Sequence, residues 1–168
     1  CDIADCHAAL VAQPQLAQLV SEHQALLDFY QQLRSFNSWY EPVPVDAAQA
    51  LPSFKSALNG QYLLLLQAWL AVQQQDIATA QQLLQQDFQF WRTLQTKHNL
   101  LLSKLIGTAA IKRHFHFAAV IQQQLSPEQY AAVSPPSWHN AFSEQELSML
   151  QVISAEWLYG NNVTEAFL

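Results

Sequence analysis

The spacing of apolar residues along the chain predicts helices almost throughout. In the N-terminal part, apolar residues recur every three or four positions over 16–33, as they do on one face of a helix. Pro14 suits the first turn of this helix, which is expected to end before Phe36. A proline-containing linker follows over 39–52, and within it Asp46 is expected to cap a short helical turn.

The middle of the chain carries the strongest helical pattern. An apolar helix is expected over 62–75, after a boundary at Asn59-Gly60. Asp76 is placed to cap the next helix, and no strong breaker follows for nearly 50 residues. Because one helix of that length is improbable, we expect a bend or break between Lys97 and Gly107. The two helices that flank Asp76 resemble the hairpin of tetratricopeptide-type repeats, although the chain holds no second copy.

Two further helix starts stand out near the C-terminal end. Ser126-Pro127-Glu128 is a strong N-terminal signal for a short helix through Val133, which Pro135-Pro136 stops. The stretch Ser143-Glu144-Gln145-Glu146 is a capping box, and the helix that it opens is expected to end at Gly160. No segment alternates convincingly as a strand does, so the fold predicted is all-α.

Length and composition fit one domain. The 168 residues are expected to form a single all-α domain, an irregular bundle of about six or seven helices with a tetratricopeptide-like hairpin. Residues 1–13 are expected to be disordered or to link the domain to a membrane anchor outside this sequence. No run of about 20 apolar residues is present, so the pattern predicts no membrane-spanning segment here.

Charge is distributed unevenly. Residues 88–127 contain no Asp or Glu and hold five of the seven basic residues, although the net charge of the chain is −6. Such a segment can bind nucleic acid, face anionic lipid headgroups, or pair with acids elsewhere in the fold. The net acidity opposes nucleic-acid binding, so we expect no nucleic-acid partner. Pairing with acids such as Asp28, Glu22 or Glu156 is favoured, and lipid headgroups are the possible alternative partner.

A helical wheel over 77–113 places three ionisable groups on the packed face. These are Asp87, His98 and, if the helix continues, Arg113. Three other cations fall outside that face, namely Arg92, Lys97 and Lys104. Buried charges need partners, so Asp87 is expected to pair with Arg113 or His98 and to fix the helix register. In the alternative interpretation these groups line a ligand pocket beside Trp91.

The motifs of common enzyme classes are not found. The chain has no Gly-x-Ser-x-Gly, no Walker loop and no Gly-x-Gly-x-x-Gly. His114 and His116 would point about 200° apart on a helix and so would not share a metal ion. We therefore expect no cofactor and no metal, and an enzyme is disfavoured. Cys1 and Cys6 either close a small disulfide loop, as in an oxidising compartment, or are free thiols, and Cys1 also suits the lipid-modified start of a mature lipoprotein.

Three short stretches resemble one protein family. They are Asp87-Phe88-Gln89-Phe90-Trp91-Arg92, Leu101-Leu102-Ser103-Lys104-Leu105-Ile106 and Lys112-Arg113. Together they resemble the D-x-x-F-W-R … S-K-x-I … R pattern of an uncharacterised proteobacterial family of membrane-anchored proteins with a helical extracytoplasmic domain. The resemblance implies no activity. It implies a periplasmic domain tethered to the inner membrane by a segment outside this sequence, and it draws attention to Ser103 beside the residues already discussed.

The function expected is that of a non-enzymatic helical domain of a cell-envelope protein, which binds a protein partner or supports an assembly. The alternative is a small-ligand or lipid-binding domain with a pocket near Trp91, His98 and Arg113, and a hydrolase with a hidden site ranks third. The candidate site residues are Asp87, Trp91, Arg92, His98, Lys104 and Arg113. Four aromatic residues either pin loops onto the core or form an exposed partner-binding patch: Trp39, Tyr40, Trp138 and Trp157.

Overall fold

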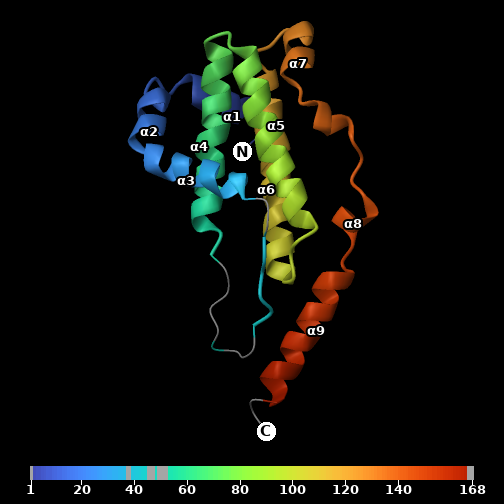
Figure 1. Ribbon diagram of the computed structural model, residues 1–168. Helices are drawn as coiled ribbons and strands as arrows, with labels where there is room; N and C mark the ends of the chain where they lie inside the picture. Colours follow the sequence, from blue (N-terminus) through green and yellow to red (C-terminus); the bar gives the residue numbers. More distant parts are fainter. Residues whose placement is uncertain (1, 37–38, 45–47, 49–52, 166–168) are drawn as a thin grey trace.

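The protein is built around three long helices that pack side by side. The structure is a computed structural model, and it describes residues 2–36, 39–44, 48 and 53–165. Within these ranges every regular element is a helix, so the all-α prediction is confirmed. The central helices are α4 (Lys55–Gln73), α5 (Ile77–Gln95) and α6 (Leu101–Gln122), shown in green to ochre in Figure 1. None of the described helices is long and apolar enough to cross a membrane.

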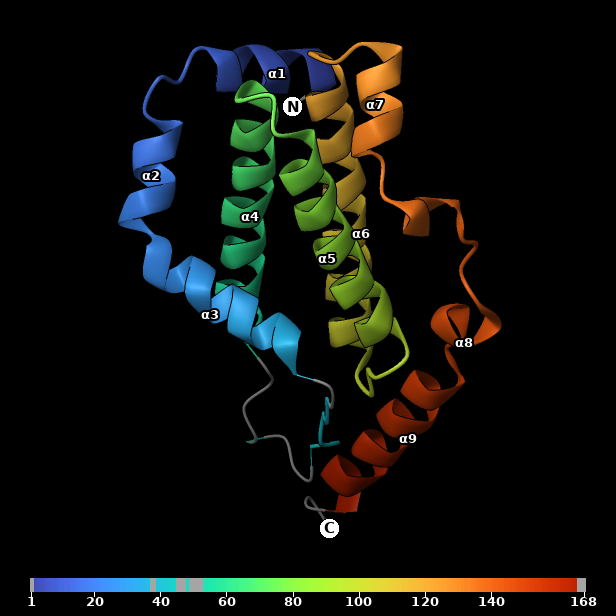
Figure 2. The same ribbon diagram turned by 45° about the horizontal axis from the view of Figure 1, so that its top comes forward.

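The N-terminal helices wrap around one side of this centre. Helix α1 (Ile3–Val11) occupies part of the segment expected to be disordered or a linker, and it lies across one end of the long helices in Figure 2. Helices α2 (Leu16–Glu22) and α3 (Gln24–Ser35) cover α4. The single helix predicted over 16–33 is therefore wrong. The chain bends at His23, and the bend allows both helices to turn apolar residues into the core.

Helix α4 begins earlier than the sequence predicts, so the boundary expected at Asn59-Gly60 is wrong. Both residues lie inside α4, where Gly60 is buried against α3. A Cβ atom on Gly60 would lie only 2.5 Å from the Cβ atom of Tyr30. Glycine is therefore needed at this position for the close approach of two helices, and it marks no turn.

The long helical stretch after Asp76 is divided as expected. Asp76 accepts a hydrogen bond from the backbone N–H of Thr79 at 3.1 Å, which confirms it as the cap of α5. The chain breaks over 96–100, at the N-terminal edge of the predicted window, and Gly107 lies inside α6. Helices α4 and α5 form a hairpin, but its likeness to tetratricopeptide repeats stays a prediction. The turn expected at Asp46 lies outside the described residues.

The C-terminal part begins against the bundle and ends away from it. It contains α7 (Pro127–Val133), the 3-10 turn η1 (Pro136–His139), α8 (Glu144–Leu147) and α9 (Leu150–Glu165). The helix start at Ser126 and the capping box at Ser143 are confirmed, and Ser126 also forms a capping box, with Gln129. The helix expected to run from the second box to Gly160 is wrong, because extended backbone at Ser148 separates α8 from α9 and α9 continues to Glu165. Figures 1 and 2 show α9 reaching away from the centre, with its contact at the start of α6.

Candidate functional site

The centre of the bundle holds a buried carboxylate with three hydrogen-bond donors. Asp87, on α5, is fully buried. Tyr30 donates its hydroxyl proton to Oδ1 at 2.5 Å. Gln61 donates from Nε2 to Oδ2 at 3.0 Å, and His114 lies with Nδ1 2.8 Å from the same oxygen. Helices α3, α4 and α6 thus each contribute one partner to a carboxylate on α5.

The protonation of His114 follows from its second partner. The indole N–H of Trp138 lies 3.0 Å from Nε2 of His114, and an indole nitrogen only donates. Nε2 must therefore accept, which leaves the proton of a neutral ring on Nδ1, where it is donated to Asp87. Both ring nitrogens of His114 are thus used inside the fold. An aspartate–histidine pair of this kind holds no nitrogen ready for a substrate.

Tyr30 connects the carboxylate to Trp91. The indole N–H of Trp91 donates to the Tyr30 hydroxyl oxygen at 2.9 Å, while that hydroxyl donates onward to Asp87. Burial, followed by the charge of Asp87, raises the pKa of Tyr30 well above its usual value. The phenol therefore keeps its proton and acts as a donor. Trp91 is fully buried as a member of this network and exposes no surface to a ligand.

The partners expected for Asp87 were wrong. Arg113 reaches Asp87 only through Gln61, whose Oε1 accepts from the guanidinium NH1 at 3.3 Å. His98 lies elsewhere, close to Glu41, with 3.9 Å between Nδ1 and Oε2. The helical wheel assumed one straight helix through 77–113, whereas the break after Gln95 rotates everything beyond it. The actual partners are Tyr30, Gln61 and His114, and Tyr30 and Gln61 lie far from Asp87 in the sequence.

Glu41 forms a second buried polar group at the start of α6. Its carboxylate accepts from the backbone N–H groups of Asn99 and Leu100, at 2.7 and 3.0 Å, and from the hydroxyl of Ser103. It thereby supplies the helix cap that no residue near the break provides. Ser103, which the family resemblance singled out, is thus a buried partner of this cap.

His98 is buried beside this cap. Neither ring nitrogen has a hydrogen-bond partner among the described residues. Burial lowers the pKa of His98 to about 4, against a weaker opposite effect of Glu41. The ring packs edge-on against Phe54 and faces Gly107, where a Cβ atom would lie 3.1 Å from Nε2.

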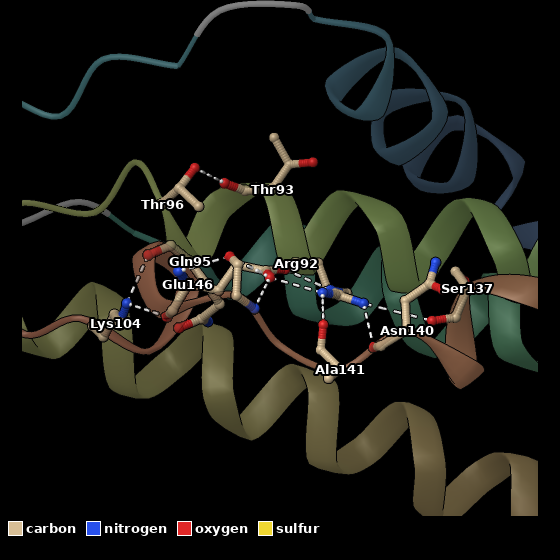
Figure 3. Close-up of polar contacts among 10 residues, drawn as sticks. Arg92, Thr93, Gln95, Thr96, Lys104, Ser137, Asn140, Ala141 and Glu146 are labelled. Carbon is tan, nitrogen blue, oxygen red and sulfur yellow. Dashed lines mark hydrogen bonds and ion pairs between the residues drawn. The ribbon is translucent and has the colours of Figure 1, made fainter.

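Arg92 and Lys104 fasten the C-terminal part to the bundle, as Figure 3 shows. Arg92 forms a two-pronged ion pair with Glu146, with 2.7 Å between NH2 and Oε2, and donates to the carbonyls of Asn140 and Ala141 at 2.9 Å. Lys104 donates from Nζ to the carbonyls of Gln95 and Glu146, each at 2.7 Å. The expectation that both cations point outward was wrong, because a later segment covers them.

Among the described Lys and Arg residues of the basic segment, the expected pairing with an acid holds for one, Arg92. Arg92 pairs with Glu146 and with none of the acids anticipated for it. Among the described residues, no carboxylate lies within ion-pair distance of Lys97, Lys112 or Arg113. Positive charge that the fold leaves unneutralised is thus present on α6, in a chain whose net charge is −6.

Two of the surfaces that the described residues leave open to other molecules are largely apolar. One is a groove of about 600 Å³ between α1, α4 and α6, which Arg113 lines and which Trp91 and His98 do not reach. The other is the outward face of α9, where Leu150 and Trp157 are 74% and 69% exposed. The described residues contain no group of three His, Cys, Asp or Glu side chains arranged to hold a metal ion.

The aromatic residues divide between the two roles considered for them. Trp138 pins its segment to His114, and Trp39 packs edge-on against Phe90. Tyr40 and Trp157 are exposed.

No family model, no curated protein and no solved structure matches this chain.

Proposed function

We propose that this chain is a non-enzymatic helical domain of a cell-envelope protein, and that it binds a protein partner through α9. The observation that carries the proposal is the apolar outer face of this helix. Val152 and Ala155 face inward and are buried. Leu150, Ile153 and Trp157 follow one another at helical spacing on the opposite side, and all three are more than half exposed.

The size and composition of this face favour a protein as its partner. Leu147 and Leu158 are also exposed, so the apolar surface extends from α8 along α9. Contiguous apolar surface of this kind commonly marks an interaction site, and tryptophan is the residue most often found at the energetic centre of such sites.

The negative charge of the C-terminal part indicates which charge the partner carries. Residues 140–168 include four glutamates and no Lys or Arg. Two of these glutamates are engaged inside the domain, Glu146 by Arg92 and Glu156 by the backbone N–H of Leu101. Glu144 stays exposed near the start of the apolar face. A partner segment that combines apolar and basic side chains, such as a basic amphipathic helix, is complementary to this surface.

Other features of the chain support the non-enzymatic role and the envelope setting. The buried ionisable pair of Asp87 and His114 is fully engaged in internal hydrogen bonds. Cys6 is a disulfide cysteine, as is usual for proteins of oxidising compartments such as the periplasm. The resemblance to membrane-anchored proteobacterial proteins suggests the same location, with a tether to the inner membrane.

The proposal is tested by photo-crosslinking in intact cells, with the crosslinkable residue placed at Ile153. The matched control places it at Phe29, an exposed apolar residue on α3. We expect a defined heterologous product from position 153 alone, and this product should contain a basic amphipathic segment. The double variant Ile153→Ser/Trp157→Ser should weaken binding of that purified partner at least tenfold at an unchanged melting temperature, since both side chains are exposed.

Several outcomes would contradict the proposal. Equal products from both positions would show that α9 is not selective. A product made only of two copies of this chain, lost in the double variant, would make α9 a self-association surface. A partner without basic residues at the crosslink, or binding that does not weaken with salt, would refute the charge argument.

A further inference from the structure

The groove between α1, α4 and α6 has an apolar wall and a positively charged rim. Leu10 and Ala9 contribute to it from α1, and Ala109, Phe117 and Val120 from α6. The basic side chains of the lining, Lys112, Arg113 and His116, lie on two adjacent turns of α6. Its volume of about 600 Å³ lies within the range of roughly 300–1,000 Å³ that is typical of small-molecule sites.

Arg113 is held in place with hydrogen-bonding capacity to spare. Its NH1 group donates to the carbonyl of Leu58 and to Oε1 of Gln61, both at 3.3 Å. The guanidinium lies over the ring of Tyr62, 3.9 Å from its centre. Among the described residues, the Nε and NH2 groups make no hydrogen bond. The side chain is thus fixed by α4, while its remaining N–H groups are free to donate hydrogen bonds to an anion.

The cations of this rim have no ion-pair partner among the described residues. Neither Arg113 nor Lys112 has a carboxylate within ion-pair distance among the described residues, and Lys112 is exposed. By contrast, Arg92 on α5, which has a structural role, binds both oxygens of the Glu146 carboxylate. Two cations left without an acid beside an apolar groove are complementary to a molecule that is both anionic and apolar.

We propose that this groove binds the carboxylate and chain of a fatty acid. The carboxylate lies between the guanidinium of Arg113 and the ammonium of Lys112, and the hydrocarbon chain lies along Leu10, Ala109 and Phe117. This site is separate from the α9 surface, since α1 and α9 lie at opposite ends of the molecule in Figures 1 and 2. The inference therefore stands or falls independently of the proposed protein partner.

The test is calorimetric titration of the whole chain with four probes at low salt, with the two amphiphiles kept below their micellar concentrations. Laurate carries both the charge and the chain. Dodecyltrimethylammonium keeps the chain and reverses the charge, butyrate keeps the charge on a short chain, and inorganic phosphate is an anion alone. We expect one laurate to bind per chain, and each of the other three probes to bind at least tenfold more weakly.

Three variants locate the site. Lys112→Gln, an exposed change, should weaken laurate binding about tenfold, the usual effect of losing one charge-assisted contact. Ala109→Trp should abolish it by filling the groove. Lys97→Gln removes an exposed cation of the same acid-free segment away from the groove and should leave the affinity unchanged. Arg113→Gln should act like Lys112→Gln, but its contacts with α4 make a melting curve necessary beside it.

Each alternative result overturns the inference. Equal binding of the cationic amphiphile means an apolar surface without charge recognition. Equal binding of phosphate means an anion site with no use for the chain. Laurate binding that survives Ala109→Trp means a different location.

Discussion

At the scale of single residues, Asp87 is the group on which most of the interior depends. Replacement by alanine removes the acceptor of three buried donors, from Tyr30, Gln61 and His114. We expect Asp87→Ala to lower the free energy of unfolding by about 3–5 kcal/mol, as measured by urea denaturation. Asp28→Ala is the matched control, because Asp28 is exposed and should change stability by less than about 0.5 kcal/mol. Similar losses in both variants would refute a special role for the buried carboxylate.

His98 is a residue whose effect depends on pH. Its pKa is about 4 in the folded protein and 6.5 in the unfolded chain, so the unfolded state binds more protons between these values. The free energy of unfolding is therefore unaffected by the titration of His98 above pH 6.5, and it decreases as the pH falls from 6.5 towards 4. From pH 7 to 4.5 the wild type should lose about 2–3 kcal/mol more than His98→Asn, because other acid-sensitive groups titrate in both. Parallel stability profiles for the two proteins, measured by urea denaturation, would exclude this assignment.

At the scale of elements, two glycines inside helices should respond in opposite ways to alanine. Gly60 lies in α4, where an added Cβ atom would be 2.5 Å from that of Tyr30. Gly60→Ala should therefore lower the free energy of unfolding by about 1–3 kcal/mol. Gly160 lies in α9 with nothing within 4 Å, so Gly160→Ala should raise it by about 0.5–1 kcal/mol. Thermal denaturation with calorimetry gives both values, and a change of the same sign in both would contradict the packing argument.

The same elements show what local pattern can predict. Helix starts marked by a side chain next to them, at Asp76, Ser126 and Ser143, were predicted correctly because the hydrogen bonds that define them are local. The start of α6 was not placed, because its cap is Glu41, about 60 residues away. Gly60 was misassigned for a related reason, since a glycine at a helix contact looks the same in sequence as one in a turn.

The same contrast between local and long-range contacts holds for the candidate site. The wheel correctly identified Asp87 as buried, because its burial depends on the periodicity of one helix. His98 is also buried, but it lies beyond the end of α5, so the periodicity of that helix does not explain its burial. The wheel could not identify their partners. Tyr30 and Gln61 come from helices whose orientation around α5 is set only by the packing of the whole bundle. Lys104 was predicted to point outward, because the segment that covers it, around Glu146, lies more than 40 residues later in the chain.

At the scale of the whole molecule, the chain combines a densely packed bundle with a C-terminal part that is attached at few places. Residues Leu27, Leu64, Leu84 and Trp91 are fully buried within the bundle, whereas α9 buries only Val152 and Ala155. The clamp formed by Arg92, Lys104 and Glu146 therefore has a disproportionate role in positioning the apolar face of α9. Such weakly attached parts open locally at a lower free energy than the core around which they are arranged.

This arrangement predicts a selective effect of Glu146→Gln. The pKa of Glu146 is held at about 2, mainly by its hydrogen bond with Arg92, so the carboxylate is charged at neutral pH and the substitution removes the ion pair. Amide hydrogen exchange by mass spectrometry should become faster over 136–165 while α4 and α5 keep their protection. Glu144→Gln is the matched control, because Glu144 is exposed in the same short helix. Faster exchange throughout the bundle, or equal effects of the two variants, would show that the clamp does not attach the C-terminal part separately from the rest of the bundle.

The same attachment should depend on pH in the wild type. Because the pKa of Glu146 is lower in the folded protein than in the unfolded chain, the stabilisation from its ion pair is lost as the pH falls from about 4.5 towards 2, and exchange over 136–165 should become faster.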